Sequence, residues 1–375
     1  MTKPIGREDL RAYAERSFFS LDEAELDTFE ALVGDLLDGV ARFEALPDPP
    51  RPVVAAEREL GRPPRAGEDP LNAIVRWCSV RAEKVPREAP LAGLRVGLKD
   101  MFAIAGLPLG FGSTVLEGYV SDEDADVTAR LLEAGAEIVA VTNMESFAFS
   151  AGGETTATGP VLNPFDLERT ACGSSSGSAA ALFYEGIDLT FGTDQGGSVR
   201  IPASWCGVLG LKPTHGLVPY TGTIPADWRF DHAGPMARDA RTLARGLDAV
   251  AEERAFDPFT KTLYTDRRGA HLDAVEAAPD RLDGIRLGVL AEGFAAADEA
   301  APAGTAETNR AVLEAVERLR LLGAEVVEVS VPAHRSATDI MFVALAESVT
   351  SAQRGASGGH AWWTRDLPHL KAGLG

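Results

Sequence analysis

From residue 94 onward, the sequence alternates between short apolar stretches typical of buried strands and stretches with the spacing of amphipathic helices. The strand-like stretches cover residues 94–100, 136–143, 188–194, 207–214, 285–293 and 324–332. The helical stretches cover residues 127–135, 174–186, 241–251 and 305–323. Strands and helices that alternate in this way form a largely parallel or mixed sheet with helices on both faces. The sequence therefore predicts the α/β class, with a central mixed, twisted sheet.

The first 70 residues follow a different pattern. Apolar side chains recur at three- and four-residue steps through residues 7–20 and 22–46, and Asp22 is placed to start the second helix. A proline-rich stretch then ends that helix. We expect an N-terminal helical segment with a Pro-rich linker over 1–70 and a main domain over 71–375. The apolar stripe of the helices needs a cover, which either docking on the main domain or a homodimer would supply.

Charge and hydropathy argue against several classes of protein. The chain carries 36 Lys and Arg against 56 Asp and Glu, and a formal net charge of −20 disfavours a nucleic-acid partner. Its apolar runs fall short of the roughly 20 residues that cross a bilayer, and its first residues contain no stretch typical of a signal peptide. Three scattered cysteines give neither a disulfide framework nor a zinc motif. We expect a cytoplasmic protein with an acidic surface.

Two stretches rich in glycine and serine are the most unusual part of the sequence. They are ACGSSSGSAAA at 171–181 and GTDQGGSVRIPAS at 192–204. Turns of this composition present backbone N–H groups to an anion or to a developing oxyanion. A phosphate-binding loop is disfavoured, because no lysine lies between Lys99 and Lys212 to complete its pattern. A dinucleotide site is disfavoured because GFG at 110–112 lacks the third glycine of the fingerprint.

Residues 173–177 match the G-x-S-x-G pattern of a hydrolase nucleophile elbow. An elbow follows a buried strand, however, and the preceding residues 163–172 are polar and contain proline. A Ser–His–Asp triad also needs a histidine, and no histidine of this sequence, the first being His215, stands in a setting typical of a general base. The pattern therefore favours a serine that is activated without histidine.

Lys99 is the candidate activator of such a serine. A serine hydroxyl is a weak nucleophile until a base takes its proton, and a lysine can be that base only while it is neutral. Lys99 lies in an otherwise apolar strand, where burial favours the neutral form. The other interpretation is structural, with the stem along apolar surface and the amine in water or paired with Asp100. The residues alone leave both interpretations open.

The order of these motifs resembles the amidase signature family of Ser–cis-Ser–Lys hydrolases. The resemblance rests on GLKD (97–100), GSSSGSAAA (173–181), GTDQGGSVRIPAS (192–204) and CGVLGLKPTHGLVP (206–219), with support over 142–166 and 220–239. The variant DQGGS and the continuation GLVPYTG are most similar to bacterial and archaeal acyl-amide hydrolases. The resemblance implies the amidase signature fold for residues 71–375.

Carried over to this sequence, the resemblance implies a catalytic triad. Ser198 would be the nucleophile, Ser174 the cis-serine that passes the proton on, and Lys99 the neutral general base. The implied oxyanion hole consists of the backbone N–H groups of Gln195, Gly196 and Gly197, joined by that of Ser198. The residues expected to support this loop are Ser175, Asp194 and Arg200. The candidates for the substrate pocket are Phe149 and Ser150, followed by Phe147, Trp205 and Trp228. The resemblance implies no metal and no organic cofactor.

The implied reaction is the hydrolysis of a carboxylic acid amide to the acid and ammonia or an amine, through an acyl-enzyme on Ser198. The expected partner is a small-molecule amide, with no direct contact to nucleic acid or membrane. Two alternatives stay open. One is an ammonia-releasing subunit of a glutamine-dependent (Glu-tRNA(Gln)) amidotransferase, and the other is a truncated, inactive homologue that acts as a binding protein.

The sequence departs from the family pattern at two points. Ser176 stands where the family usually has glycine, and if φ is positive there the serine is strained by about 1 kcal/mol. Family members also continue well past the point where this sequence ends. The resemblance therefore predicts that the C-terminal part of the domain is missing.

Overall fold

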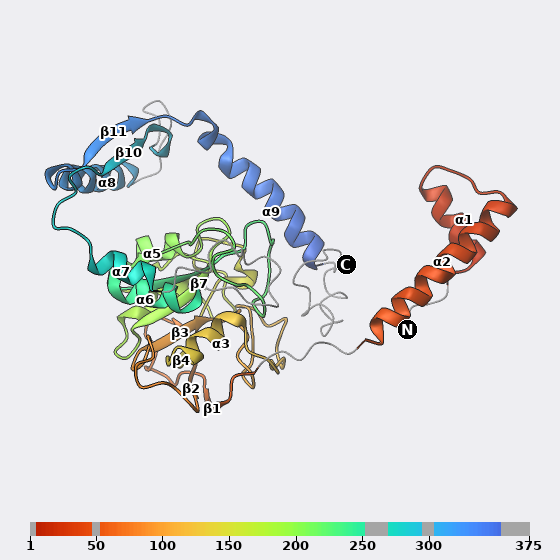
Figure 1. Ribbon diagram of the computed structural model, residues 1–375, viewed down its shortest axis with the longest axis horizontal. Coiled ribbons are helices and arrows are strands. Elements are labelled where there is room, and N and C mark those ends of the chain that lie inside the picture. The colour runs from red at the N-terminus through yellow and green to blue at the C-terminus, as the bar shows by residue number, and fades with distance from the viewer. Residues whose placement is uncertain (1–4, 47–52, 252–268, 295–303, 354–375) are drawn as a thin grey trace. The chain divides into compact units, whose positions relative to one another are not determined.

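The apolar stretch that ends at Lys99 forms strand β3 (Arg95–Lys99), the middle strand of a seven-stranded sheet in the computed structural model (Figure 1). Its neighbours β4 (Glu137–Thr142) and β7 (Leu189–Thr193) run parallel to it. The other pairs in this sheet are antiparallel, and the strand order is β1-β2-β4-β3-β7-β9-β8. The sheet is mixed, as the sequence predicts.

The structure describes residues 5–46, 53–251, 269–294 and 304–353. The remaining strands of the main sheet are β1 (Ala56–Arg62), β2 (Ile74–Ala82), β8 (Leu209–Gly210) and β9 (Ala233–Ala237). The helices around it include α3 (Asp126–Glu133), α4 (Ser176–Ala180), α5 (Arg200–Trp205), α6 (Ala240–Val250) and α7 (Ala270–Glu276). A separate hairpin consists of β5 (Leu162–Asn163) and β6 (Asp166–Thr170). The 3-10 turns are η1 (Ser146–Ala148), η2 (Ala181–Phe183), η4 (Ala291–Gly293) and η5 (Pro332–Ser336).

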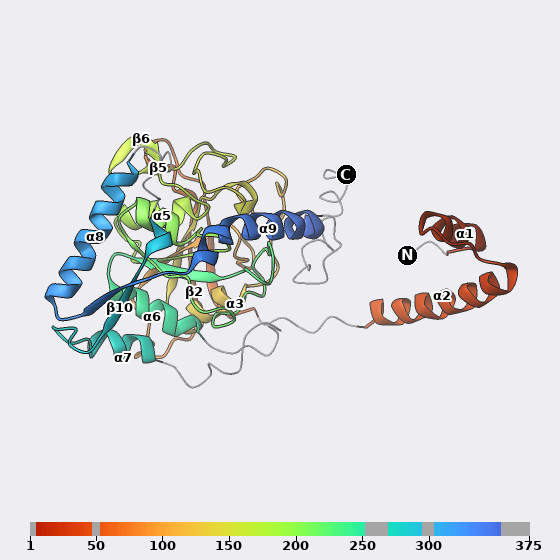
Figure 2. The same ribbon diagram turned by 90° about the horizontal axis from the view of Figure 1, so that it is seen from above.

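Two apolar clusters pack against the sheet. One contains side chains of α3 and α6, among them Leu131 and Leu247, and the other contains side chains of α4 and α5, among them Ala179 and Ala203. Figure 2 shows α5 on the side of the sheet opposite to α3 and α6. Each face of the sheet is therefore covered, because both of its faces are apolar and must be kept from water. The predicted α/β class is confirmed.

Three strands of the sheet lie outside the predicted ones: β1, β2 and β9. β1 is an edge strand with a largely exposed surface, and it pairs antiparallel with β2 from Ala56 opposite Ala82. It lies within residues 1–70, where we expected helices and a linker. β9 is fully buried but has the sequence AGPMA, whose glycine and proline are untypical of strands. The predicted division of the chain at residue 70 stays a prediction.

Two predicted elements are shorter in the structure. The helix expected over 174–186 begins only at Ser176, because the backbone of Ser175, with φ of −89° and ψ of 46°, is not helical. The strand expected over 207–214 is reduced to β8, since Gly207 has a φ of +65° and Pro213 has no N–H for a sheet.

The part of the chain after the main sheet contains a separate two-stranded sheet. β10 (Arg286–Leu290) and β11 (Glu325–Val329) pair in parallel, and α8 (Thr305–Leu321) is the helix between them in sequence. The helix α9 (Ala337–Gln353) follows. Among the described helices, none combines the length and the apolar character needed to cross a bilayer.

Contacts divide the chain into two units, Met1–Arg51 and Pro52–Gly375. The first contains the two predicted helices, α1 (Arg7–Arg16) and α2 (Glu23–Glu44). The Asp22 side chain accepts the N–H of Glu25, while the Glu25 side chain accepts the N–H of Asp22. Arg7 joins the two helices through Glu23 at 2.9 Å. The large apolar side chains that this unit exposes include Tyr13, Phe18, Leu32, Leu36 and Phe43.

Candidate active site

Lys99 and Thr193 are the last residues of β3 and β7, two parallel neighbours. The carboxyl ends of parallel strands meet at one edge of a sheet, which is where α/β folds place their sites. The Lys99 amine lies 2.8 Å from the Thr193 hydroxyl and 2.7 Å from the Ser174 hydroxyl, and all three side chains are buried. The structure thus brings together two of the three residues predicted as a triad.

The environment of Lys99 favours a neutral amine. Burial lowers the pKa of Lys99 to about 7, although the carboxylates of Asp194 and Glu145 act to raise it. A neutral amine can accept a proton from a hydroxyl neighbour, because a hydroxyl donates as readily as it accepts. The purely structural interpretation paired Lys99 with Asp100, but the Asp100 carboxylate instead accepts the backbone N–H of Gly110 at 3.0 Å.

Ser174 is held in place by its backbone. The peptide bond that precedes it is cis, and its carbonyl oxygen accepts the N–H of Glu145 at 3.0 Å. A Cβ on Gly173 would lie 2.5 Å from Cγ of Glu145. Only glycine therefore fits before Ser174, since the buried Glu145 side chain fills the space beside it.

Asp194 organises the loop that carries Ser198. It follows β7 directly, and its carboxylate accepts the N–H groups of Gly197 at 2.8 Å and of Val199 at 3.2 Å. The Arg200 guanidinium adds a bidentate pair, with Nη2 at 2.8 Å and Nε at 2.9 Å. Burial opposes the charge of Asp194, but the hydrogen bonds and charge of Arg200 hold its pKa below the ordinary value. Asp194 and Arg200 thus form a buried-to-surface ion pair beside the Ser198 loop.

Of the four backbone donors that the resemblance implies for the oxyanion hole, three are available to an anion. The N–H groups of Gln195, Gly196 and Ser198 have no hydrogen-bond acceptor among the residues that the structure describes. The N–H of Gly197, which the resemblance included in the oxyanion hole, is already engaged by Asp194. Gly197 has a φ of +127°, a conformation that side chains rarely tolerate.

Ser175 connects the two serine-rich loops. Its N–H donates to the carbonyl oxygen of Ser198 at 3.2 Å, and its hydroxyl donates to the carbonyl oxygen of Thr193 at 3.2 Å. Ser198 itself is half-buried, so its side chain is nearer to solvent than those of Ser174 and Ser175. These contacts fix the loop of Ser198 against the turn of Ser174.

Ser176, the departure from the family pattern, adopts the conformation of a helix. It is the first residue of α4 and is not among the residues with positive φ, so the strain considered above does not arise. Its buried hydroxyl has no hydrogen-bond partner among the described residues. The serine fits the backbone but leaves one polar atom unsatisfied.

Three of the residues predicted for the substrate pocket, Phe147, Phe149 and Ser150, lie on the loop after β4. Trp205 is the last residue of α5, and both it and Trp228 are about half exposed. Phe149 is 48% exposed, and the Ser150 hydroxyl accepts the N–H of Gly152 at 3.1 Å. Phe147 packs edge-on against Phe111, with ring centroids 5.3 Å apart, so it belongs to a small apolar cluster. That Phe149 and Ser150 line a substrate pocket stays a prediction.

Three residues around the Ser198 loop, Thr193, Tyr220 and Asp231, were not predicted from the sequence. Thr193 contacts Lys99, and the Gln195 side chain donates to Tyr220 and to Asp231. Thr193 could have been found from its place next to the Asp194 motif. Nothing in the sequence indicates which acid of the 220–239 stretch approaches the loop.

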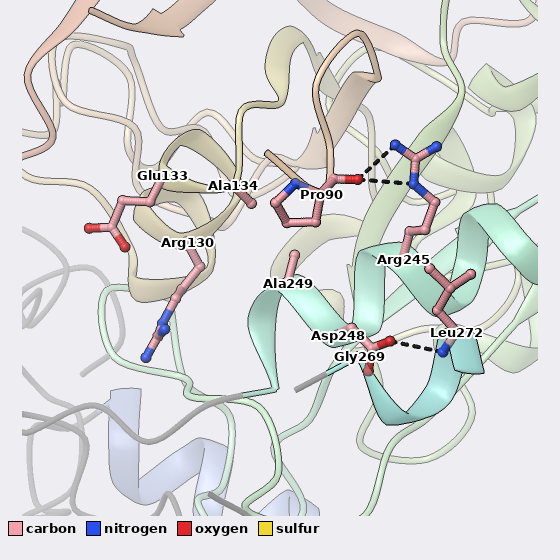
Figure 3. A pocket seen from close by; sticks show the side chains of 9 residues that line it. All are labelled: Pro90, Arg130, Glu133, Ala134, Arg245, Asp248, Ala249, Gly269 and Leu272. Atoms are coloured by element: carbon pink, nitrogen blue, oxygen red, sulfur yellow. Dashed lines mark hydrogen bonds between the residues drawn. The ribbon is translucent and has the colours of Figure 1, made fainter. Parts of the chain in front are cut away.

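A hollow lies between α3, α6 and α7, and none of the candidate site residues lines it (Figure 3). It has a volume of about 310 Å³, and its polar groups are engaged in structural contacts. Arg245 donates to the carbonyl oxygen of Pro90 at 2.7 Å, and Asp248 accepts the N–H of Leu272 at 2.9 Å. In the described part of the chain, no cluster of three or more His, Cys, Asp or Glu side chains is placed to hold a metal ion.

Known proteins with similar sequences and folds are amidases and amidotransferase subunits. The model of the family described as Amidase matches residues 71–365. One subunit of the glutamyl-tRNA(Gln) amidotransferase from Anaeromyxobacter is 36% identical over 75% of this chain and 54% of its own. The crystal structure of the corresponding subunit from Thermotoga maritima superposes with a TM-score of 0.65 at 28% identity, over 81% of this chain and 64% of that one.

A peptide amidase is similar as well. The native enzyme from Stenotrophomonas maltophilia superposes with a TM-score of 0.63 at 30% identity, over 76% of this chain and 60% of that one. This chain spans about half the length of the curated relatives that it matches.

Proposed function

This chain belongs to the amidase family, and from that membership we propose that it hydrolyses a carboxylic acid amide through an acyl-enzyme on Ser198. The observation that carries the proposal is the contact between the buried Lys99 amine and the Ser174 hydroxyl at 2.7 Å. A buried lysine whose hydrogen bonds go to hydroxyl groups, beside a serine at a sheet edge, is suited to remove a proton from a serine nucleophile.

In the proposed first step, neutral Lys99 accepts the proton of Ser174 as Ser174 takes the proton of Ser198. The Ser198 oxygen then bonds to the amide carbonyl carbon, and the carbonyl oxygen becomes an oxyanion. The free N–H groups of Gln195 and Gly196, with that of Ser198, would stabilise this charge.

In the second step, the tetrahedral intermediate collapses and its C–N bond breaks. The proton held by Lys99 returns through Ser174 to the leaving nitrogen, so that ammonia or an amine departs. Water then attacks the acyl-enzyme with the same groups acting in the same order, and the acid is released. In this proposal Ser175, Asp194 and Arg200 hold the loop, and Phe149 and Ser150 contact the substrate.

The setting in which ammonia is released separates two candidate functions. The sequence alone places a free-standing amidase first and an amidotransferase subunit second. The comparisons favour the second, because the curated relatives are named as one and the same subunit of glutamyl-tRNA(Gln) amidotransferase. We therefore propose glutamine as the first amide to test and the other subunits of such an amidotransferase as the partners.

That proposal is tested by measuring ammonia release from glutamine with and without the remaining subunits of a glutamyl-tRNA(Gln) amidotransferase. Release that depends on the subunits supports the amidotransferase setting. Release from simple aliphatic or aryl amides by the chain alone would return the free-standing amidase to first place.

The N-terminal unit supports a proposal about assembly. Two helices with exposed Leu32, Leu36 and Phe43 bury little apolar surface by themselves. A second copy of the unit would cover these side chains in a homodimer, and Leu36→Glu is expected to give a monomer in size-exclusion chromatography with light scattering.

The proposed compartment is the cytoplasm, which suits the free Cys78, Cys172 and Cys206.

The chemistry itself is tested by intact mass after incubation with a fluorophosphonate probe. We expect a single adduct that is absent from Ser198→Ala and formed slowly by Lys99→Ala. A folded wild-type chain that forms no adduct would instead support the remaining alternative, an inactive homologue that acts as a binding protein.

A further inference from the structure

The side chain of Gln195 is held in one orientation. Its amide nitrogen donates to a carboxylate oxygen of Asp231 at 2.7 Å and to the hydroxyl of Tyr220 at 3.1 Å. An amide nitrogen has two hydrogens, so these two contacts use both of its donors. Gln195 is therefore held by its side chain, at the first position of the proposed oxyanion hole.

Asp231 is a firm anchor for this contact. It is buried, and its two carboxylate oxygens each lie 3.2 Å from the N–H of Ala226. The carbonyl oxygen of the next residue, His232, accepts the N–H of Asp194 at 2.9 Å, and β9 begins directly afterwards with Ala233 opposite Thr193. Asp231 thus stands at the end of a strand that is paired with the strand leading into the Ser198 loop.

A polar path continues from Asp231 to the proposed base. The Tyr220 hydroxyl, which the Gln195 side chain contacts, also hydrogen-bonds the side chain of Thr193. Thr193 in turn contacts the Lys99 amine at 2.8 Å. The acid, the oxyanion loop and the lysine are joined by consecutive hydrogen bonds between buried or half-buried groups.

We propose that Asp231 is a positioning residue of this site, which acts through the Gln195 side chain to hold the backbone donors of the oxyanion hole. The inference rests on the proposed function, since it gives Asp231 a role in that reaction. Donors that are fixed before the reaction stabilise an oxyanion best, and a displacement of about 1 Å can slow catalysis a hundredfold. A carboxylate is the strongest available acceptor for the Gln195 amide.

The charges around Asp231 come from two neighbouring elements. Burial raises the pKa of Asp231 to about 7, the Gln195 and backbone hydrogen bonds lower it, and the Asp227 carboxylate raises it further. Asp227 is itself paired with Arg229 at 2.7 Å. Tyr220 is the other titratable group in reach, and burial followed by the charge of Asp231 raises its pKa, which keeps it neutral.

The test is the rate of adduct formation between the fluorophosphonate probe and Ser198 in the full chain, because the phosphoryl oxygen of that adduct needs the same donors as an oxyanion. We expect Asp231→Asn to slow labelling by about tenfold to a hundredfold. Asp227→Asn is the matched control, since Asp227 is an equally buried acid whose side chain pairs with Arg229. It is expected to label at the wild-type rate.

A double-variant cycle separates positioning from general stability. Gln195→Ala removes the partner of Asp231, so Asp231→Asn should add no further loss in that background. Losses that multiply in the double variant, or a folded Asp231→Asn protein that labels like wild type, would overturn the inference. If Asp231→Asn does not fold, Gln195→Ala alone decides, and a wild-type labelling rate in it would also overturn the inference. An unlabelled wild type would reject the proposed function instead.

Discussion

The loop that carries Ser198 is held from two sides by two buried acids. On one side, Asp194 accepts backbone N–H groups and pairs with the Arg200 guanidinium at 2.8 Å. On the other, Asp231 accepts a backbone N–H and pairs with the neutral amide of Gln195 at 2.7 Å. Both side chains are shielded from water, with Asp194 at 0% and Asp231 at 7% exposure.

The two acids have opposite pKa shifts although their burial is similar. Burial raises both pKa values, but the Arg200 cation reverses the effect for Asp194, whereas Gln195 has no charge with which to do so. Asp194 is therefore charged throughout the neutral range, and Asp231 changes its charge near pH 7. For these two acids, the charge of the hydrogen-bond partner decides the direction of the pKa shift more than the degree of burial does.

In the proposed mechanism both acids brace the loop and Lys99 is the proton acceptor. We expect Lys99→Met to slow fluorophosphonate labelling by about a thousandfold, within the range for loss of a general base. The folded state should be as stable as the wild type or more so, because an apolar chain replaces a buried amine. The labelling rate checks the catalytic part of this prediction, and urea unfolding checks the part on stability.

A thermal or urea midpoint well below that of the wild type would contradict this prediction, because it would make Lys99 a structural residue. Labelling of Lys99→Met at the wild-type rate would assign the proton transfer to another group.

Asp194, which stays charged throughout the neutral range, should hold the loop more strongly than Asp231. Asp194→Asn removes the charge that Arg200 and the loop donors need, and we expect labelling to fall by about a hundredfold. The free energy of unfolding should fall by about 2 kcal/mol, between the values for exposed and buried pairs, because Arg200 is 51% exposed.

Asp227→Asn is the matched control for Asp194→Asn. Asp227 pairs with a half-exposed arginine, Arg229, in the same way, but that pair lies within residues 227–229 rather than in the Ser198 loop. The variant should lose a similar amount of stability and keep its labelling rate. Equal losses of labelling in the two variants would remove the distinction between bracing and folding.

The titration of Asp231, together with that of Lys99, predicts how the labelling rate depends on pH. Lys99, with a pKa lowered to about 7, must be neutral to accept a proton, and Asp231, with a pKa raised to about 7, must be charged to hold Gln195. Both active forms lie on the alkaline side. Below pH 7 we expect the labelling rate to fall by more than the roughly tenfold per pH unit that a single proton causes.

The two variants show which group binds each of the two protons. Asp231→Asn should restore the single-proton slope at a lower plateau. Asp227→Asn should keep the steep limb but move its Asp231 part to lower pH, because the Asp227 carboxylate raises the pKa of Asp231. A wild-type profile with a single-proton slope would mean that Asp231 does not titrate in the range of Lys99.

The sequence predicts the central part of this arrangement well. β3, β4 and β7 are short strands whose middle residues are mostly apolar, and the motifs around Lys99, Ser174 and Asp194 are local enough to be recognised directly. Asp231 could not be predicted, because its contact joins residues that are 36 positions apart and depends on the pairing of β7 with β9. β9 in turn has a glycine and a proline in five residues, so its place in the sheet is decided by tertiary packing rather than by propensity.

The smallest expected effect concerns two buried hydroxyl groups. It tests whether hydrogen-bond partners or burial decide what such a group contributes to the free energy of unfolding. Ser176 and Ser178 lie two residues apart in α4 and are both fully buried. The Ser178 hydroxyl contacts Thr142 at 2.7 Å and Phe191 at 3.2 Å, while that of Ser176 has no partner among the described residues. Ser178→Ala should lower the free energy of unfolding by about 1–2 kcal/mol, because it leaves former partners unsatisfied.

Ser176→Ala should act in the opposite direction. It removes a buried hydroxyl that has lost its hydrogen bonds to water, and alanine favours the helix, so we expect a gain of about 1 kcal/mol with an unchanged labelling rate. Urea unfolding of both variants at one pH provides the comparison. If Ser176→Ala is destabilised as much as Ser178→Ala, the number of hydrogen-bond partners does not decide what a buried hydroxyl contributes to stability on this helix. If the two changes in the free energy of unfolding have opposite signs, hydrogen-bond partners matter more than burial for uncharged groups too, as they do for the pKa values of Asp194 and Asp231.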